Sequence, residues 1–448
     1  MIGTWKLGRR IGAALSVLAL TAASLPAQKW DVPASAAEWA TSRSKRKLKV
    51  SGEVRGRYER RTGQNFGASP DLDTALIRSR LSLSYTPVAW LKVSGAVQDS
   101  RAPGYGVNAP NTVRNEADWL EGYIEIHPDQ KKGFGATVGR MMLNYGETRL
   151  LASSQWGNVT RSFDHVRLYW KASRGQAEFL WLSPTKARLG AFDRPVLGER
   201  VWGTYNSMPN LFGKSLVEAY ILRHDQNYPG GFTGGSKVAG TGRLGVTTFG
   251  GRMTGPLQGG LKYSIEGAVQ TGKVGAARHR AAAWFSALSR RWMVAKLPLD
   301  AIGEYKYASG TQNPQDPTRV GTFDPLFPST HDKFGHMDLF GWRNIHNARG
   351  LGTLGLTKSF AMNLMYDSWW LASKRDALYN SSGKSVAKSA SGVAGRHVGQ
   401  ELDVFGTYKY RRFTFGAGCG RLFKGEFVRN ATLGVSPTYA YVFHTYAF

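Results

Sequence analysis

One pattern recurs along most of this sequence: segments of about ten residues in which apolar and polar side chains alternate. The segment 48–59 alternates Leu, Val, Gly and Tyr with Lys, Ser, Glu and Arg. The same alternation recurs at 75–85, 91–98, 165–172, 261–270 and 401–410. Because successive side chains of a strand point to opposite faces, this period of two predicts β-strands with one apolar and one polar face.

The last segment, Thr438–Phe448, is rich in aromatic residues and alternates as well. Its apolar face carries Ala440, Val442, His444, Tyr446 and Phe448. This arrangement is typical of the closing strand of an outer-membrane β-barrel, so we expect it to pair with the first strand. An aromatic C-terminal strand of a soluble β-sandwich is the alternative.

The N-terminal residues have the order of a secretory signal peptide. Lys6, Arg9 and Arg10 precede the apolar run 11–20, and small residues follow. We predict a signal peptide over 1–36, with cleavage after Ala27 or Ala36, a basic segment over 37–47, and one barrel domain over 48–448. Beyond residue 36, no apolar stretch approaches the ~20 residues of a membrane-spanning helix.

The predicted connections are of two sizes, short turns such as 86–89 and long polar loops such as 102–115, 229–242, 310–333 and 379–397. Short periplasmic turns and long extracellular loops are the usual asymmetry of these barrels. Strands of about ten residues leave room for roughly sixteen to eighteen strands. A barrel of that size is expected to enclose a lumen rather than a packed core. The segments 215–226 and 279–292 alternate poorly, so the strand count is open there.

Fifty-nine Lys and Arg face 31 Asp and Glu, which gives a formal net charge of +28. A base on the lipid face near the membrane centre costs ~2–4 kcal/mol, whereas a whole fold is stable by about 5–15 kcal/mol. Bases that alternate with apolar partners must therefore face the interior, where they would select anions. These bases are Arg55, Arg57, Arg78, Arg80, Lys92, Arg167, Lys171, Lys262 and Lys409.

Three blocks of sequence resemble the bacterial alginate-export outer-membrane proteins. The first runs over 139–150 (GRMMLNYGETRL), 156–158 and 161–168. The second comprises 323–328 (FDPLFP), His331, 334–335 and 341–344. The third comprises 399–403 (GQELD) and 416–427. The resemblance implies a monomeric barrel of about eighteen strands whose electropositive pore passes an anionic polyuronate.

The resemblance also implies roles for residues at matching positions. Candidate pore or structural bases are Arg140, Arg149, Arg161, Arg167, Arg343 and Arg421. Candidate counter-charges are Glu401, Asp403 and, beside Arg161 and Arg167, Asp164; for those two arginines a wall-locking ion pair is an equal alternative. Cys419 and Lys424 depart from the family pattern, and the middle third matches poorly, which leaves the substrate open rather than the architecture.

Motifs for enzymes and cofactors are absent. The sequence has no His-Glu-x-x-His zinc motif and no Gly-x-Ser-x-Gly nucleophile elbow, and Ser382-Gly-Lys-Ser385 lacks the upstream glycine of a phosphate loop. His331 and His336 share a segment with Asp332 and Asp338, which we interpret as a solvated outer loop rather than a metal site. We predict no enzymatic activity and no cofactor.

Together these patterns predict an outer-membrane channel that passes an anionic polysaccharide, such as alginate or its oligosaccharides, without an energy source. A general anion-preferring porin and a non-conducting structural or surface-binding barrel remain as alternatives. Expected partners are the polysaccharide, outer-membrane lipid and lipopolysaccharide, and the barrel-assembly machinery through the strand ending at Phe448. Nucleic acid is not expected as a partner, since it would not explain the signal peptide.

Overall fold

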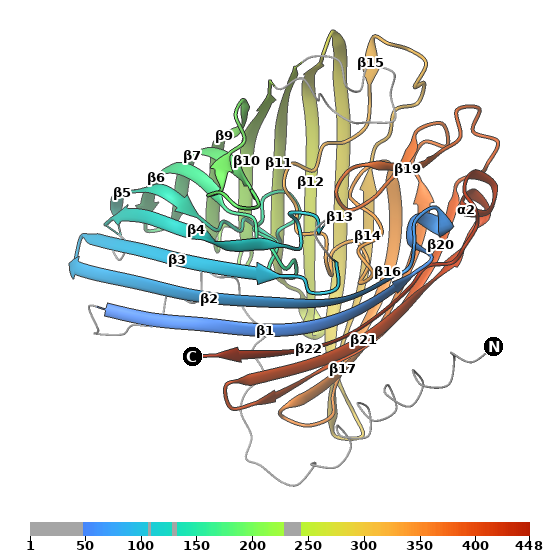
Figure 1. Ribbon diagram of the computed structural model, residues 1–448. Coiled ribbons are helices and arrows are strands. Elements are labelled where there is room, and N and C mark those ends of the chain that lie inside the picture. Colours follow the sequence, from blue (N-terminus) through green and yellow to red (C-terminus); the bar gives the residue numbers. More distant parts are fainter. Residues whose placement is uncertain (1–47, 106–108, 128–131, 228–242) are drawn as a thin grey trace.

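The computed structural model describes residues 48–448 except 106–108, 128–131 and 228–242. The predicted signal peptide and basic segment, and the whole of the predicted loop 229–242, therefore lie outside the described residues. In the described part, eighteen long antiparallel strands close into a barrel (Figure 1). The prediction of an antiparallel barrel of about eighteen strands is confirmed. The described residues contain no helix that is long and apolar enough to cross a membrane.

The wall consists of the following strands, in chain order: β1 (Leu48–Thr62), β2 (Leu72–Val88), β3 (Leu91–Arg101), β4 (Asn115–Ile126), β5 (Gly133–Met141), β6 (Phe163–Ala172), β7 (Gly175–Lys186), β9 (Glu199–Pro209), β10 (Leu216–Gln226), β11 (Leu244–Pro256), β12 (Leu261–Val274), β13 (Ala277–Val294), β14 (Leu297–Ala308), β16 (Ile345–Gly355), β17 (Phe360–Leu371), β20 (His397–Tyr410), β21 (Phe413–Lys424) and β22 (Thr438–Ala447). Short elements in the connections are η2 (Gln64–Gly67), β8 (Arg194–Pro195), η4 (Gln258–Gly260), β15 (Arg319–Val320), β18 (Ala377–Tyr379), β19 (Ser385–Lys388) and α2 (Glu426–Ala431).

The barrel closes where β22 pairs with β1, as the sequence predicts. The amide of Gly52 donates to the carbonyl of Phe448, and the amide of Phe448 donates back to Gly52, both at 3.0 Å. Val442 lies opposite Tyr58, and both side chains are exposed on the outer face. The register of this closure therefore puts the apolar face of β22 outward, where lipid surrounds the barrel.

Two connections turn into the barrel interior instead of extending away from it. We call residues 142–162, between β5 and β6, inner loop A, and residues 309–344, between β14 and β16, inner loop B. They pair with each other, because Leu151 and Phe327 form a parallel bridge and the amide of Ala152 donates to the carbonyl of Phe327 at 2.8 Å. The predicted outer loop 310–333 is thus only partly outside: β15 pairs with the long-loop end of β13, whereas the later residues fold inward.

The inner loops pack a hydrophobic cluster against inward-facing residues of the wall. Leu151, Phe323 and Trp342 from the loops are buried with Leu222 of β10 and Phe285 of β13. This packing explains why 215–226 and 279–292 alternate poorly: their inner faces are partly apolar because they contact loop residues rather than water. The expected open lumen is corrected to an interior that is partly filled by two loops.

We predict that Gly52→Val impairs closure of the barrel. The ring of Phe448 lies over Gly52, and a Cβ at this position would come within 2.3 Å of it. Overpacking of this kind costs about 1–3 kcal/mol. The folded fraction, measured by heat-modifiable migration in gel electrophoresis, should fall. Gly350→Val is the matched control, since a Cβ at that strand glycine meets nothing within 4 Å. Equal folding of both variants would contradict the prediction.

Candidate functional site in the barrel interior

Three arginines of β1 and β2 converge on one short stretch of inner loop A. Arg55 donates to the carbonyls of Gln155, Trp156 and Gly157 at 3.0–3.2 Å. Arg78 donates to the carbonyls of Gln155 and Gly157 at 2.8 Å, and Arg57 donates to Trp156 at 2.6 Å. These guanidinium groups are buried beneath the loop rather than exposed along an open lumen.

The register explains why the loop stabilises this part of the wall. Arg55 and Arg78 are direct cross-strand partners, and like charges in that position repel. Carbonyl oxygens of loop A accept hydrogen bonds from the Nη atoms of both guanidinium groups. Hydrogen bonds to a charged group are worth about 1.5–3 kcal/mol each. Loop A and the arginine cluster therefore depend on each other.

The cluster keeps an excess of positive charge. Arg57 and Arg61 pair with Glu59, and Arg78 pairs with Glu53 at 2.6 Å. Arg55 donates only to carbonyls. Arg80 donates to neutral side chains, those of Gln98, Gln155 and Thr160. Five arginines thus share two glutamates, and neutral acceptors take further hydrogen bonds from them without removing their charge.

The far part of inner loop A is fixed to the opposite wall by Arg149. Its Nη1 atom lies 3.0 Å from Oε2 of Glu266 on β12, and its guanidinium lies 3.3 Å from the ring centroid of Phe285. Arg161, at the other end of the loop, donates to the carbonyls of Ala152 and Pro328. Burial lowers the pKa of Arg161 to about 10, so it stays charged at neutral pH. Both predicted bases hold the loops in place.

Inner loop B is fixed by its own charged contacts. Arg343 pairs with Asp324 at 3.1 Å, and Asp324 accepts a hydrogen bond from His224 of β10 at 2.7 Å. On the other side of the barrel, the carbonyl of Met337 accepts from Arg61 of β1 at 2.8 Å. Loop B therefore spans the interior from β10 to β1.

The predicted solvated loop around His331 and His336 is instead a buried junction of the two inner loops. His331 stacks on Trp156 of loop A with ring centroids 4.1 Å apart. Burial opposes protonation of His331, but the carboxylates of Asp332 and Asp338 outweigh burial and raise its pKa. Burial lowers the pKa of His336. The pKa values of the two histidines are thus shifted in opposite directions.

Two predicted pore bases lie on the outer face and are corrected here. Arg421 shares a face with Cys419 and Leu402, is exposed, and lies 5.6 Å from the ring of Phe423. Strand parity puts Arg140 and Asp164 on the face of Val138 and Val166, where they form an ion pair at 2.6 Å. Both sites are at the long-loop ends of their strands, beyond the apolar part of the wall. These residues were predicted to face the pore from the family resemblance alone. The alternation of side chains along the strands was not used to assign their face.

The remaining predicted bases face inward. Arg167 pairs with Glu178 at 3.5 Å, which is the wall-locking ion pair that the sequence left open. Lys171 lies near the ring of Tyr169, and Lys409 is exposed at the short-turn end. Lys262 is also exposed and shares the inner face with Glu266. Short turns are usually periplasmic, so these lysines surround the periplasmic mouth.

The predicted counter-charges Glu401 and Asp403 are fully buried on β20, next to Asp367 of β17. Among the described residues, none of the predicted bases forms an ion pair with them.

Functional contacts that the sequence did not reveal include Arg61, Arg349 and the carbonyls of Gln155–Gly157. The alternation at 48–62 places Arg61 on the basic face. Nothing in the sequence indicates that backbone carbonyls of a distant loop are the partners.

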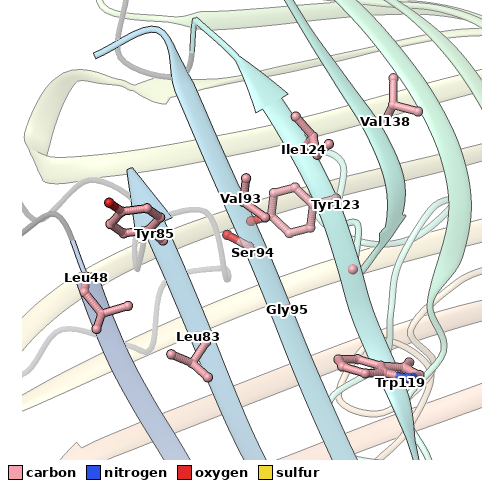
Figure 2. Close-up of a pocket in the computed structure, with 11 residues that line it drawn as sticks. Leu48, Leu83, Tyr85, Val93, Ser94, Gly95, Trp119, Tyr123, Ile124 and Val138 are labelled. Atoms are coloured by element: carbon pink, nitrogen blue, oxygen red, sulfur yellow. The ribbon is translucent and has the colours of Figure 1, made fainter. Parts of the chain in front are cut away.

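A hollow of about 440 Å³ lies on the outer wall between β1 and β5 (Figure 2). Its lining includes the exposed apolar side chains of Leu83, Ile124 and Val138. This surface suits lipid chains and has no feature for an anionic substrate. We therefore place the candidate functional site in the interior, around inner loop A.

We predict that Arg55→Ala/Arg78→Ala loosens inner loop A. The double variant loses five hydrogen bonds from guanidinium to the loop carbonyls. Amide hydrogen exchange across 153–160 should accelerate by at least one to two orders of magnitude, since the loss of even one hydrogen bond to a charged group costs about 1.5–3 kcal/mol. Lys262→Ala, an inward base on β12 with no recorded contact to loop A, should leave this exchange unchanged. Unchanged exchange in the double variant would contradict the docking role.

Comparison with known proteins agrees with this architecture. The family model described as alginate export matches residues 46–442. No sequence among curated proteins matches this chain. Among solved structures, the outer membrane protein OpdK from Pseudomonas aeruginosa has a TM-score of 0.59 at 8% identity, covering 90% of this chain and 98% of that one.

Two further Pseudomonas aeruginosa structures are similar in fold. OccK11 (OpdR) has a TM-score of 0.58 at 10% identity, covering 90% of this chain and 96% of that one. OccK2 (OpdF), in complex with glucuronate, has a TM-score of 0.57 at 10% identity, covering 90% of this chain and 98% of that one. These identities support the fold alone. Given the family match over nearly its whole length and the closed barrel, the chain is an outer-membrane β-barrel that belongs to the alginate export family.

Proposed function

We propose that this outer-membrane channel passes an anionic polysaccharide, and that the charged inner loops form the selective part of its path. The observation that carries the proposal is the excess of arginine over glutamate where inner loop A meets β1 and β2. A fixed cluster of guanidinium groups lowers the free energy of an anion nearby and raises that of a cation.

The inward lysines at the short-turn end extend this positive lining to the mouth. Lys262 and Lys409 are exposed there and face the interior. A lysine is a hydrated point charge with three donors and no fixed geometry, so it attracts a carboxylate without holding it rigidly. A polyuronate that enters from the periplasm would meet weak sites first and the arginine cluster later. This order of charges suits export.

The family name supports a polyuronate as cargo, and a carboxylate on every sugar matches repeated basic sites. The general anion-preferring porin requires the same field but no preference for a long chain. The non-conducting barrel has one observation in its favour, the hydrophobic packing of the two inner loops inside the wall. Measurements of conductance and of its block by oligouronates therefore separate the three functions.

We further propose that the protein is a monomer and that the barrel-assembly machinery inserts it through β22.

We predict anion-selective current in planar bilayers, blocked by oligouronates added on the periplasmic side. Lys262→Glu should shift the reversal potential toward cations and weaken block roughly two- to five-fold, because one favourable charge becomes repulsive. The matched control is Arg290→Glu, which makes the same charge change on the outer face. Arg290 follows Ser289, the cross-strand partner of Lys262 on β13. Block by a neutral oligosaccharide of equal length would favour the general porin. Absence of any current would favour the closed barrel.

A further inference from the structure

A cluster of three carboxylates lies on the inner wall where β17 pairs with β20. Asp367, Glu401 and Asp403 each have an exposed fraction of 0%. Asp367 is the cross-strand partner of Glu401, and Asp403 follows two residues later on the same face. One oxygen from each of the three carboxylates lies within 4.8 Å of the others. Carboxylates this close repel strongly unless something positive lies between them.

Part of this cluster has no hydrogen-bond donor in the described chain. Oε2 of Glu401 and both carboxylate oxygens of Asp403 are buried without one. The other oxygen of Glu401 accepts from the amide of Met337 at 3.0 Å, and Asp367 accepts from Asn347 and Arg349. The three oxygens without a donor thus belong to Glu401 and Asp403, which have no ion-pair partner among the described residues. A buried polar atom without a partner is rare and requires an explanation.

The charges around the cluster do not balance. The neighbouring bases are Arg349, which pairs with Asp367 and Glu304, and Lys306, which pairs with Glu304. Arg149 also lies near Glu304 but is itself paired with Glu266, so among the described residues two cations remain for four carboxylates: Glu304, Asp367, Glu401 and Asp403. Burying two uncompensated negative charges costs many kcal/mol. One divalent cation would neutralise the group.

We propose that Asp367, Glu401 and Asp403 bind a divalent cation, and that Ca²⁺ fits best. Calcium takes six to eight oxygen ligands at about 2.3–2.6 Å, so two of its ligands lie at most about 5 Å apart. The spacing of the carboxylate oxygens meets this condition. Thiolate and imidazole are absent from the group, which disfavours zinc and copper. The proposal stands on this geometry and does not depend on the substrate of the channel.

The ion would fix inner loop B to the wall. Glu401 holds the amide of Met337, and the carbonyl of the same residue accepts from Arg61 of β1. Gly335 lies so close that a Cβ there would come within 2.7 Å of Glu401. A neutralised and immobile Glu401 therefore positions this part of loop B. Loss of the ion would leave two repelling carboxylates directly beneath the loop.

The test uses full-length mature protein refolded without lipopolysaccharide in a defined detergent, so that no lipid-bound calcium interferes. After dialysis against micromolar Ca²⁺, elemental analysis should find one ion per chain. EDTA should lower the melting temperature, and Ca²⁺ should restore it. Asp403→Asn should lose both the ion and the response. Asp316→Asn, an exposed acid in the same inner loop, should keep both.

Three outcomes would overturn the calcium site. The first is that wild-type protein contains no stoichiometric Ca²⁺ and that EDTA does not change its melting temperature. This result would show that a shared proton neutralises the cluster. Restoration by Mg²⁺ but not by Ca²⁺ would assign the wrong ion. Retention of the ion by Asp403→Asn would place it elsewhere. Because ion content is measured first on the wild type, a variant that fails to fold leaves the test decisive.

An independent feature lies on the outer face, where three bases gather at the long-loop end. Lys273 of β12 is the cross-strand partner of Arg278 of β13, and Arg280 follows on the same face. All three are exposed, and none has an ion-pair partner among the described residues. Within the described part of the chain, no ion pair therefore compensates the positive charge of this patch.

The position of the patch along the barrel identifies what lies beside it. Trp292, Leu288 and Trp284 are exposed on the same face of β13 and mark the apolar band. Arg280 lies twelve residues from Trp292 in sequence, which corresponds to roughly 30 Å along the axis of a tilted strand. The lipid-facing band of such barrels is about 25 Å tall. The three bases thus lie just beyond the acyl chains, at the depth of lipid phosphates.

We propose that Lys273, Arg278 and Arg280 bind the phosphate groups of a phosphorylated glycolipid in the outer leaflet. Bis-phosphorylated lipid A should raise the melting temperature of refolded protein, whereas dephosphorylated lipid A and inorganic phosphate should not. The variant Lys273→Gln/Arg278→Gln/Arg280→Gln should lose most of this increase. Lys262→Gln, an inward base of β12, should keep it. An equal response to lipid A with and without phosphate, or in the triple variant, would overturn the proposal.

Discussion

The arrangement of the interior depends on guanidinium groups that are held by backbone carbonyls. Arg55 and Arg78 are adjacent like charges on β1 and β2, and in an open water-filled barrel they would repel each other. Inner loop A supplies the carbonyls of Gln155–Gly157 between them. Since carbonyl oxygens are neutral acceptors, these contacts fix the loop without cancelling the charge of the two guanidinium groups.

The two inner loops are held by different parts of the barrel wall. Loop A is fixed at β1 and β2 by arginine, and at β12 by Arg149 and Glu266. Loop B is fixed at β10 by Asp324 and at β20 by Glu401. The stacked rings of Trp156 and His331 join them. A change at any of these contacts reaches both loops, because they share one hydrophobic cluster against the wall.

The candidate site was only partly predictable from the sequence. Alternation identified the inward face of β1 and β2 with Arg55, Arg57 and Arg78, because a base among lipid-facing residues is too costly. It could not identify their partners, which lie about a hundred positions away in the chain and are backbone atoms. Arg140 and Arg421 were misplaced because the resemblance alone suggested them, and near the strand ends an outward base costs little. Glu401 and Asp403 were expected to pair with arginines, and their neighbour Asp367 became visible only through strand register.

By itself, the sequence determined the barrel. A period of two with lipid-compatible side chains on one face fixes strand direction, face and closure between β1 and β22, because each wrong face costs several kcal/mol in lipid. Only the tertiary structure decided what fills the barrel. Whether 142–162 and 309–344 extend outward or fold inward depends on contacts between segments that are distant in the chain: carbonyls with Arg55, Met337 with Glu401, and Leu151 with Phe327. Such contacts leave no periodic signal, since loop residues are selected by individual partners rather than by a repeating environment.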